Sequence, residues 1–115
     1  PYVITAIGER AARRYFITAE RFDAHKAMQI GLLTEVVDAE NLDDQINLLI
    51  EAVLANGPEA VVAAKQLVSD VSGQTIDQSL IDHTCEVIAT IRVSQQGQEG
   101  LNAFLEKRKP NWLKD

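Results

Sequence analysis

The sequence is poor in cysteine and in long apolar runs. Its one cysteine, Cys85, excludes an intrachain disulfide and is compatible with a reducing compartment. We expect Cys85 to lie buried as a small apolar residue. No apolar run approaches the ~18 residues that a transmembrane helix needs, and no secretory signal peptide is recognisable. These absences predict a cytoplasmic protein that has no membrane partner.

Positive charge is also scarce. The 115 residues carry a net charge of −6, which argues against a nucleic-acid partner, because general nucleic-acid binding needs a broad basic face. The composition, 46% hydrophobic and 24% charged, is ordinary for a soluble globular protein. The length allows one small domain with one core.

The exception to the acidic character is the stretch 107–115, which holds four cations and one carboxylate and has a net charge of +3. A cationic tip on an acidic body predicts an anionic partner, for which a phosphate is the obvious candidate. The alternative is local, because cations in the last turn of a helix favour the negative end of its dipole by about 0.3–1 kcal/mol each. The residues alone leave both interpretations open.

Apolar periodicity predicts a mainly α fold with five or six helices and one short extended segment. The extended segment, 32–37, is short and ends in β-branched residues, so it is either a strand or only a connector. The last helix is expected to bury Leu101, Phe104 and Leu105. The predicted helices cover residues 2–17, 24–30, 40–55, 58–72, 76–93 and 96–108.

Local signals mark the ends of several helices. Asp23 can cap the second helix, and Gly31 can end it. Pro58 suits the first position of the fourth helix. Thr75 and Gln78 fit a capping box that opens the fifth, in which the Thr hydroxyl accepts from the Gln backbone N–H.

A lone strand among helices makes a poor self-contained fold, because a single strand needs a partner. The sequence therefore predicts one helical region, 1–115, with sub-parts 1–38 and 39–115. This region is expected to pack either on the rest of its own polypeptide or on other subunits.

The titratable residues show no catalytic or metal-binding constellation. His25 and His83 are far apart in sequence, and neither has metal-ligand spacing with another His or Cys. His83 and Cys85 are two apart on a helix, so they point in different directions. Glu99 and Glu106 are seven apart and read as a charged outer helix face.

Three stretches of sequence carry a resemblance to a known family. They are Ala6-Ile-Gly-Glu-Arg-Ala-Ala12 with Tyr15-Phe-Ile-Thr-Ala-Glu-Arg-Phe-Asp-Ala24, then Ala27-Met-Gln-Ile-Gly-Leu-Leu-Thr-Glu-Val-Val37, and Gln98-Glu-Gly-Leu-Asn-Ala-Phe-Leu-Glu-Lys-Arg-Lys-Pro-Asn-Trp112. With Asn56-Gly57-Pro58 between them, they resemble, in order, the C-terminal part of the enoyl-CoA hydratase/isomerase (crotonase) family.

The resemblance implies that a spiral core of strands and helices, which carries catalysis, lies upstream of residue 1. In the family, two backbone N–H groups polarise a thioester carbonyl and two carboxylates activate water for addition to the α,β double bond. No catalytic residue is therefore expected in this chain, and the isolated chain should be inactive. The resemblance implies no cofactor beyond the coenzyme A (CoA) of the acyl-CoA substrate.

The resemblance also implies what these helices do. In the family they cover the active site, build a homo-trimer or hexamer, and contact CoA bound by a neighbouring subunit. The positions that match the CoA contacts are Phe104, for the adenine, and Lys107, for a phosphate; Arg108 would add long-range attraction. For Phe104 the alternative is core packing. The stretch 4–16 looks most like members that act on methylglutaconyl-CoA or carboxygeranoyl-CoA.

Two hypotheses follow. The first is a fragment of an enoyl-CoA hydratase, a lyase of fatty acid metabolism. The second is a helical interaction module without chemistry, which uses the same apolar faces to bind a partner and has no affinity for CoA.

Overall fold

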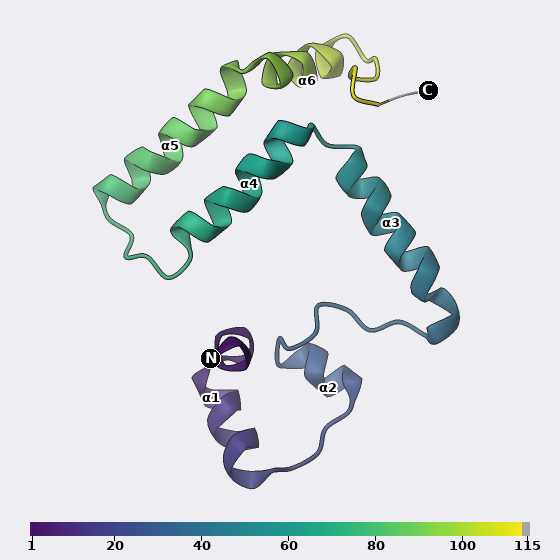
Figure 1. Ribbon diagram of the computed structural model, residues 1–115, viewed down its shortest axis with the longest axis vertical. Coiled ribbons are helices and arrows are strands. Elements are labelled where there is room, and N and C mark those ends of the chain that lie inside the picture. Colours follow the sequence, from purple (N-terminus) through teal and green to yellow (C-terminus); the bar gives the residue numbers. More distant parts are fainter. Residues whose placement is uncertain (114–115) are drawn as a thin grey trace. The chain divides into compact units, whose positions relative to one another are not determined.

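The computed structural model describes residues 1–113, and these form six α-helices and one 3₁₀ turn (Figure 1). Lys114 and Asp115, which complete the predicted basic tip, lie outside the described residues. The helices are α1 (Tyr2–Thr18), α2 (Ala24–Gln29), α3 (Leu42–Leu54), α4 (Pro58–Val71), α5 (Gln78–Val93) and α6 (Gln95–Leu105), and the 3₁₀ turn η1 (Ala39–Asn41) precedes α3. The mainly α prediction is confirmed.

No β-strand is present between residues 1 and 113, so the segment 32–37 is a connector and its strand interpretation is wrong. Its β-branched residues favour extended backbone, but a strand also needs a neighbouring strand to accept and donate its backbone hydrogen bonds. The described residues provide no such neighbour.

The helix ends follow the sequence signals in part. The Asp23 carboxylate accepts from the backbone N–H of Lys26 at 2.8 Å, and Gly31, with φ of 85°, terminates α2 as predicted. The capping box at Thr75 is wrong. Asp77 is the N-cap of α5, and its carboxylate accepts from the backbone N–H of Leu80 at 2.9 Å. An ionised carboxylate is a stronger acceptor than a hydroxyl, so the helix begins two residues later.

Helix α1 is not continuous. Gly8 has φ of 74° and ψ of 160°, which interrupts the helical backbone, and Figure 1 shows α1 changing direction near its start. The apolar spacing of residues 2–17 predicts one helix, but it contains no information on this break. A glycine can adopt positive φ without the steric cost that a Cβ would add.

The chain divides into two compact units, Pro1–Gln45 and a second that begins at Ile46. In the second unit α4 and α5 form an antiparallel pair, and α6 contacts both of them (Figure 1). This unit carries the candidate site.

Very little of either unit is buried. The buried hydrophobic residues within residues 1–113 are three alanines: Ala12, Ala27 and Ala103. The apolar stripe predicted on α3 exists, but its members Ile46, Leu49 and Val53 are all exposed. Exposed apolar surface on this scale is typical of a surface that another protein segment covers.

The length and hydropathy of the helices can be compared with those of a membrane span. Within residues 1–113 no single helix is both long and apolar enough to span a bilayer. The segments Ala39–Leu54 and Pro58–Val71 reach that length only together, across a bend of 103°.

Candidate functional site

Phe104 and Lys107 lie next to each other at the end of α6. The backbone N–H of Lys107 donates to the Phe104 carbonyl at 3.2 Å. Phe104 is 81% exposed, so it is not packed into a core formed by the described residues. Leu101 and Leu105 are exposed as well, whereas Ala103 on the opposite side is only 2% exposed.

The predicted helix 96–108 is too long at its C-terminal end, because α6 ends at Leu105. Two backbone bonds close the turn: Lys107 N–H to Phe104 and Arg108 N–H to Ala103, the latter at 3.0 Å. This is the pattern of a Schellman motif, in which the residue after the C-cap is usually glycine in the left-handed region. Here that residue is Lys107, with φ of 54°. The cations thus follow the helix end instead of occupying its last turn.

Arg108 is held by two carboxylates. Its Nη1 and Nη2 donate to Glu99 Oε1 at 2.6 Å and Oε2 at 2.9 Å, and its Nε donates to Glu106 Oε2 at 2.6 Å. The Glu99 carboxylate also accepts from the Asn111 backbone N–H at 2.9 Å. A bidentate pair of this kind fixes both partners. The positive charge of Arg108 is therefore offset locally, which leaves little for the expected long-range attraction.

These contacts shift two pKa values. The hydrogen bonds from Arg108, followed by the one from the Asn111 backbone, lower the pKa of Glu99 to about 2. The same pair, with a further contribution from Glu106, raises the pKa of Arg108 above its ordinary value. The interpretation of Glu99 as part of a solvated face is wrong, since its side chain is only 18% exposed.

The residues that follow fold back onto the start of α4. The indole Nε1–H of Trp112 donates to the Ala55 carbonyl at 3.2 Å. Its ring lies 3.1 Å from the ideal Cβ position of Gly100, which is tighter than an ordinary contact, and 3.5 Å from that of Gly57, which is ordinary van der Waals contact. The tail from Lys107 to Trp112 is thus anchored at both ends.

The direction of α6 is set by its junction with α5. Ser94 is both the C-cap of α5 and the N-cap of α6, and its Oγ accepts from the Gly97 N–H at 3.0 Å. A Cβ at Gly97 would stand 2.0 Å from the Ile91 carbonyl oxygen. Only glycine permits the two helices to approach in this way. The Gln96 side chain also accepts from the Glu59 N–H at 3.0 Å, which ties the start of α6 to the start of α4.

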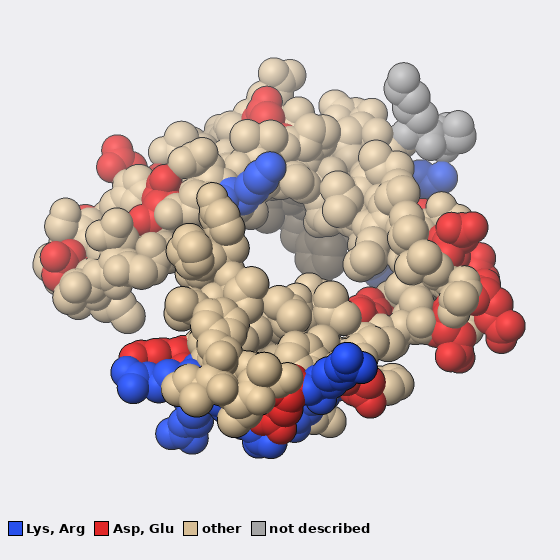
Figure 2. Space-filling model, turned by 60° about the horizontal axis from the view of Figure 1, so that its bottom comes forward, with Lys and Arg blue, Asp and Glu red and all other residues tan. Residues whose placement is uncertain are grey.

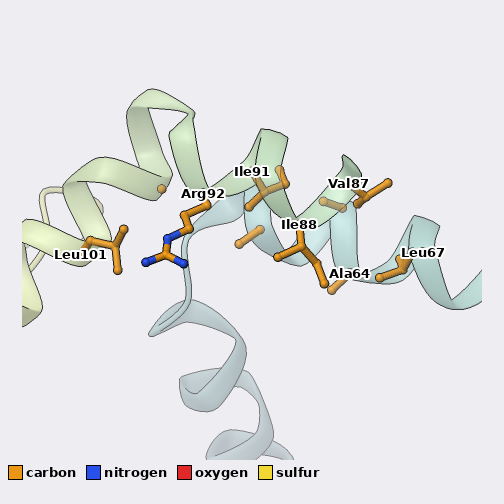
Figure 3. A pocket seen from close by; sticks show the side chains of 10 residues that line it. Ala64, Leu67, Val87, Ile88, Ile91, Arg92 and Leu101 are labelled. Carbon is orange, nitrogen blue, oxygen red and sulfur yellow. The ribbon is translucent and has the colours of Figure 1, made fainter. Parts of the chain in front are cut away.

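An apolar groove of about 390 Å³ lies between α4, α5 and α6 (Figure 3). Alanines of α4, including Ala64, form one wall, and Ile88 and Ile91 of α5 form the other. Arg92 extends along the groove toward Leu101 in Figure 3. Apart from Arg92, the side chains that line the groove are apolar, so it offers no carboxylate, imidazole or nucleophile.

The remaining titratable candidates stay separate. Within residues 1–113 no group of three or more His, Cys, Asp or Glu could hold a metal ion. His83 Nε2 of α5 lies 3.7 Å from the carboxylate of Asp70 on the neighbouring helix α4, and both side chains are partly exposed. Cys85 is exposed, so the expectation that it is buried is wrong; α5 has too little packed against it to cover that face.

Charge is distributed unevenly on the surface. Figure 2 shows a face on which Lys and Arg gather mainly at one edge, among Asp and Glu, while most of the rest is uncharged. In the first unit Arg14 is paired with Glu20, and this pairing lowers the pKa of Glu20. Cations thus lie among acids there and do not form a continuous basic patch.

The depressed pKa of Glu99 predicts a pH dependence of tail docking. A carboxyl group whose pKa is lower in the docked state than in the undocked state stabilises docking when it is ionised. For Glu99 this contribution is complete above about pH 4.5 and is lost as the pH falls toward about 2. Because Trp112 is the one tryptophan, its fluorescence reports docking. We expect the fluorescence to change across pH 4.5 to 2, and Glu99→Gln to lack that part of the change. A control, Glu86→Gln on α5, should keep the wild-type profile; an unchanged profile in Glu99→Gln contradicts the assignment.

Comparison with known proteins points to one family. A family model described as enoyl-CoA hydratase/isomerase matches residues 1–115. The solved structure of an enoyl-CoA hydratase from Shewanella pealeana is 51% identical with a TM-score of 0.87, and the match covers 97% of this chain and 42% of that one.

Curated relatives are more distant. A crotonyl-CoA hydratase of Syntrophomonas wolfei is 29% identical over 93% of this chain and 41% of its own length. A methylmalonyl-CoA decarboxylase of Escherichia coli is 28% identical over 92% of this chain and, again, 41% of its own length. The chain thus spans less than half the length of these relatives. Since the family model matches throughout, the resemblance is confirmed at the family level, and the chain belongs to the enoyl-CoA hydratase/isomerase family.

Proposed function

We propose that this chain is the helical C-terminal part of an enoyl-CoA hydratase. Its own contributions are contact with CoA, subunit assembly into a trimer or hexamer, and cover for the active site, while the catalytic groups lie elsewhere in the polypeptide. Membership of the family and the share of its relatives that the chain spans support this division of roles.

The observation that carries the proposal is the exposed pair Phe104 and Lys107. The phenyl ring offers a face to the adenine, and stacking of that kind suits a flat, weakly polar base. The ammonium of Lys107 offers three donors to a phosphate. Because the two residues share one turn, a nucleotide could meet both at once.

The exposed apolar faces support the assembly role. The stripe on α3 and the groove between α4 and α5 would be costly to leave in water, at about 25 cal/mol for each Å² of apolar surface. In a complete polypeptide, the rest of the chain or a neighbouring subunit would cover them. The isolated 115-residue chain should therefore be inactive and should self-associate.

The reaction itself is proposed at the level of the class, the addition of water to an enoyl-CoA. Relatives named as a hydratase and as a decarboxylase match 93% and 92% of this chain at similar identity, so the helices do not distinguish these reactions. Methylglutaconyl-CoA and carboxygeranoyl-CoA remain a prediction from the stretch 4–16. A substrate panel that includes both, alongside crotonyl-CoA, tests the class and the subtype together on the product of the native gene. The intact mass of that product distinguishes a hydratase from a stand-alone interaction module.

Removing the Lys107 ammonium is expected to weaken substrate binding without slowing the chemistry. In the active protein, Lys107→Gln should raise KM for acyl-CoA about 2- to 5-fold and leave kcat nearly unchanged, because an exposed ion pair far from the reacting carbon contributes about 0.5–1 kcal/mol of uniform binding. The measurement is steady-state hydration monitored by loss of the enoyl absorbance.

Two further variants isolate the ammonium from its backbone. Lys107→Gly should raise KM equally but keep or increase the thermal midpoint, since glycine adopts φ of 54° without strain. Lys65→Ala, which removes an exposed lysine of α4, is the matched control and should leave KM unchanged. If Lys107→Gln leaves KM at the wild-type value, Lys107 does not contact the substrate.

A further inference from the structure

The side chain of Lys107 differs from that of its neighbour Arg108 in its contacts with the described residues. Within residues 1–113 its ammonium makes no hydrogen bond or ion pair, whereas the neighbouring Arg108 is bound by Glu99 and Glu106. A free lysine side chain on a turn samples many directions, so whatever restricts the backbone beneath it decides where the ammonium points.

The backbone at Lys107 needs external support. A non-glycine residue in the left-handed region costs about 1–2 kcal/mol relative to the right-handed one, so it persists only where neighbouring contacts impose it. The two backbone bonds of the Schellman turn supply part of that support. The next residue, Arg108, supplies the rest through its bidentate contact with Glu99.

Glu99 connects the turn to the helix and to the tail. It stands on α6, it binds Arg108 immediately after Lys107, and it accepts from Asn111 three residues further on. Its side chain is mostly covered, which a carboxylate tolerates only when its acceptors are satisfied. A single side chain thus spans the loop that presents Lys107.

We propose that Glu99 is a positioning residue for CoA binding: it holds the 107–111 loop on α6 so that the Lys107 ammonium is aimed at a phosphate of the acyl-CoA. This rests on the proposed function, since it takes Lys107 to be the phosphate contact. Glu99 itself touches no substrate. It acts through Arg108 and the Asn111 backbone.

The test compares two substrates in the active protein, the enoyl-CoA and the corresponding enoyl-pantetheine thioester, which lacks the nucleotide and its phosphates. We expect Glu99→Ala to raise KM for the CoA thioester roughly 3-fold or more, with kcat unchanged, because it removes uniform binding. KM for the pantetheine thioester should not change. The conservative Glu99→Gln keeps an acceptor for the Asn111 backbone N–H. Its KM for the CoA thioester should lie between those of the wild type and Glu99→Ala.

A double variant separates this role from general stability. If Glu99 acts through Lys107, Glu99→Ala should add nothing to the KM of Lys107→Gln, because the ammonium it positions is already absent. The exchange Glu99→Arg with Arg108→Glu re-forms the pair and should restore part of the lost binding. Equal losses on both thioesters, or additive effects of Glu99→Ala and Lys107→Gln, overturn the proposal.

The phosphate contact of Lys107 and the positioning role of Glu99 can be overturned separately. If Lys107→Gln leaves KM for the CoA thioester unchanged, the phosphate contact is wrong and the positioning role falls with it. If Lys107→Gln raises KM but Glu99→Ala does not, the contact stands and only the positioning role is overturned.

Discussion

Gly97→Ala should lower the stability of the second unit more than Gly100→Ala, the same change at the other glycine of α6. The new Cβ would lie 2.0 Å from the Ile91 carbonyl oxygen and 3.0 Å from that of Arg92, and both are backbone atoms that cannot rotate away. Overpacking of this kind costs about 1–3 kcal/mol, and more when the backbone must move. We expect a fall of several degrees in the thermal midpoint of the protein that contains this chain.

Gly57→Ala is the matched control for Gly97→Ala. Gly57 has φ of −62°, which alanine adopts freely, and a Cβ there would meet the Gln96 and Trp112 side chains at an ordinary 3.5 Å. Its thermal midpoint should lie close to that of the wild type. Equal midpoints for the two variants would show that α5 and α6 do not require the close approach at Gly97.

Trp112→Ala should release the C-terminal tail from the α3–α4 turn. It removes the ring that lies against Gly57 and Gly100 and the indole donor to Ala55. Loss of a packed aromatic ring costs about 3–5 kcal/mol when it is fully buried, and we expect about half of that at this partly exposed site. Because the tail also carries Lys107 and Arg108, which pairs with Glu99 of α6, the variant should raise KM for acyl-CoA as well.

Trp112→Phe resolves the two parts of that loss. It keeps most of the packing and removes only the hydrogen bond to Ala55, for which about 0.5–1.5 kcal/mol is typical. The expected order of thermal midpoints is wild type, then Trp112→Phe, then Trp112→Ala. A Trp112→Ala variant with the midpoint and KM of the wild type would mean that the tail is not docked in solution.

Most of the helices could be predicted from the sequence, because they depend on local information. Apolar residues recur with the helical period, and Asp23, Gly31 and Pro58 carry signals that act within one turn. The break at Gly8 could not be predicted, since one glycine within a periodic pattern is compatible with a continuous helix. The C-terminal end of α6 could not be predicted, because its Schellman turn has lysine instead of the usual glycine at the left-handed position. The sequence therefore contains no glycine to mark the end of the helix.

The candidate site was predicted only in part, and for a similar reason. Phe104 and Lys107 follow from the family resemblance, whereas Glu99 reads from its spacing as a solvated acid. Its role depends on Arg108 and Asn111 being folded back, which is a tertiary contact with no periodic signature. One indirect signal of the folded-back tail was available in the sequence. Gly57 and Gly100 stand at a helix N-cap and inside a helix, where larger residues are common, and the structure places both against the Trp112 ring.

The shared cap at Ser94 makes the junction between α5 and α6 intolerant of changes in length. One residue ends one helix and begins the next, so no loop is present to absorb an insertion or deletion. Each residue added to α6 between Gly97 and Phe104 would rotate the end of the helix by about 100° and advance it by about 1.5 Å. Homologous chains that use the same pair of positions should therefore keep the spacing from Ser94 to Lys107 constant, even where the residues between them differ.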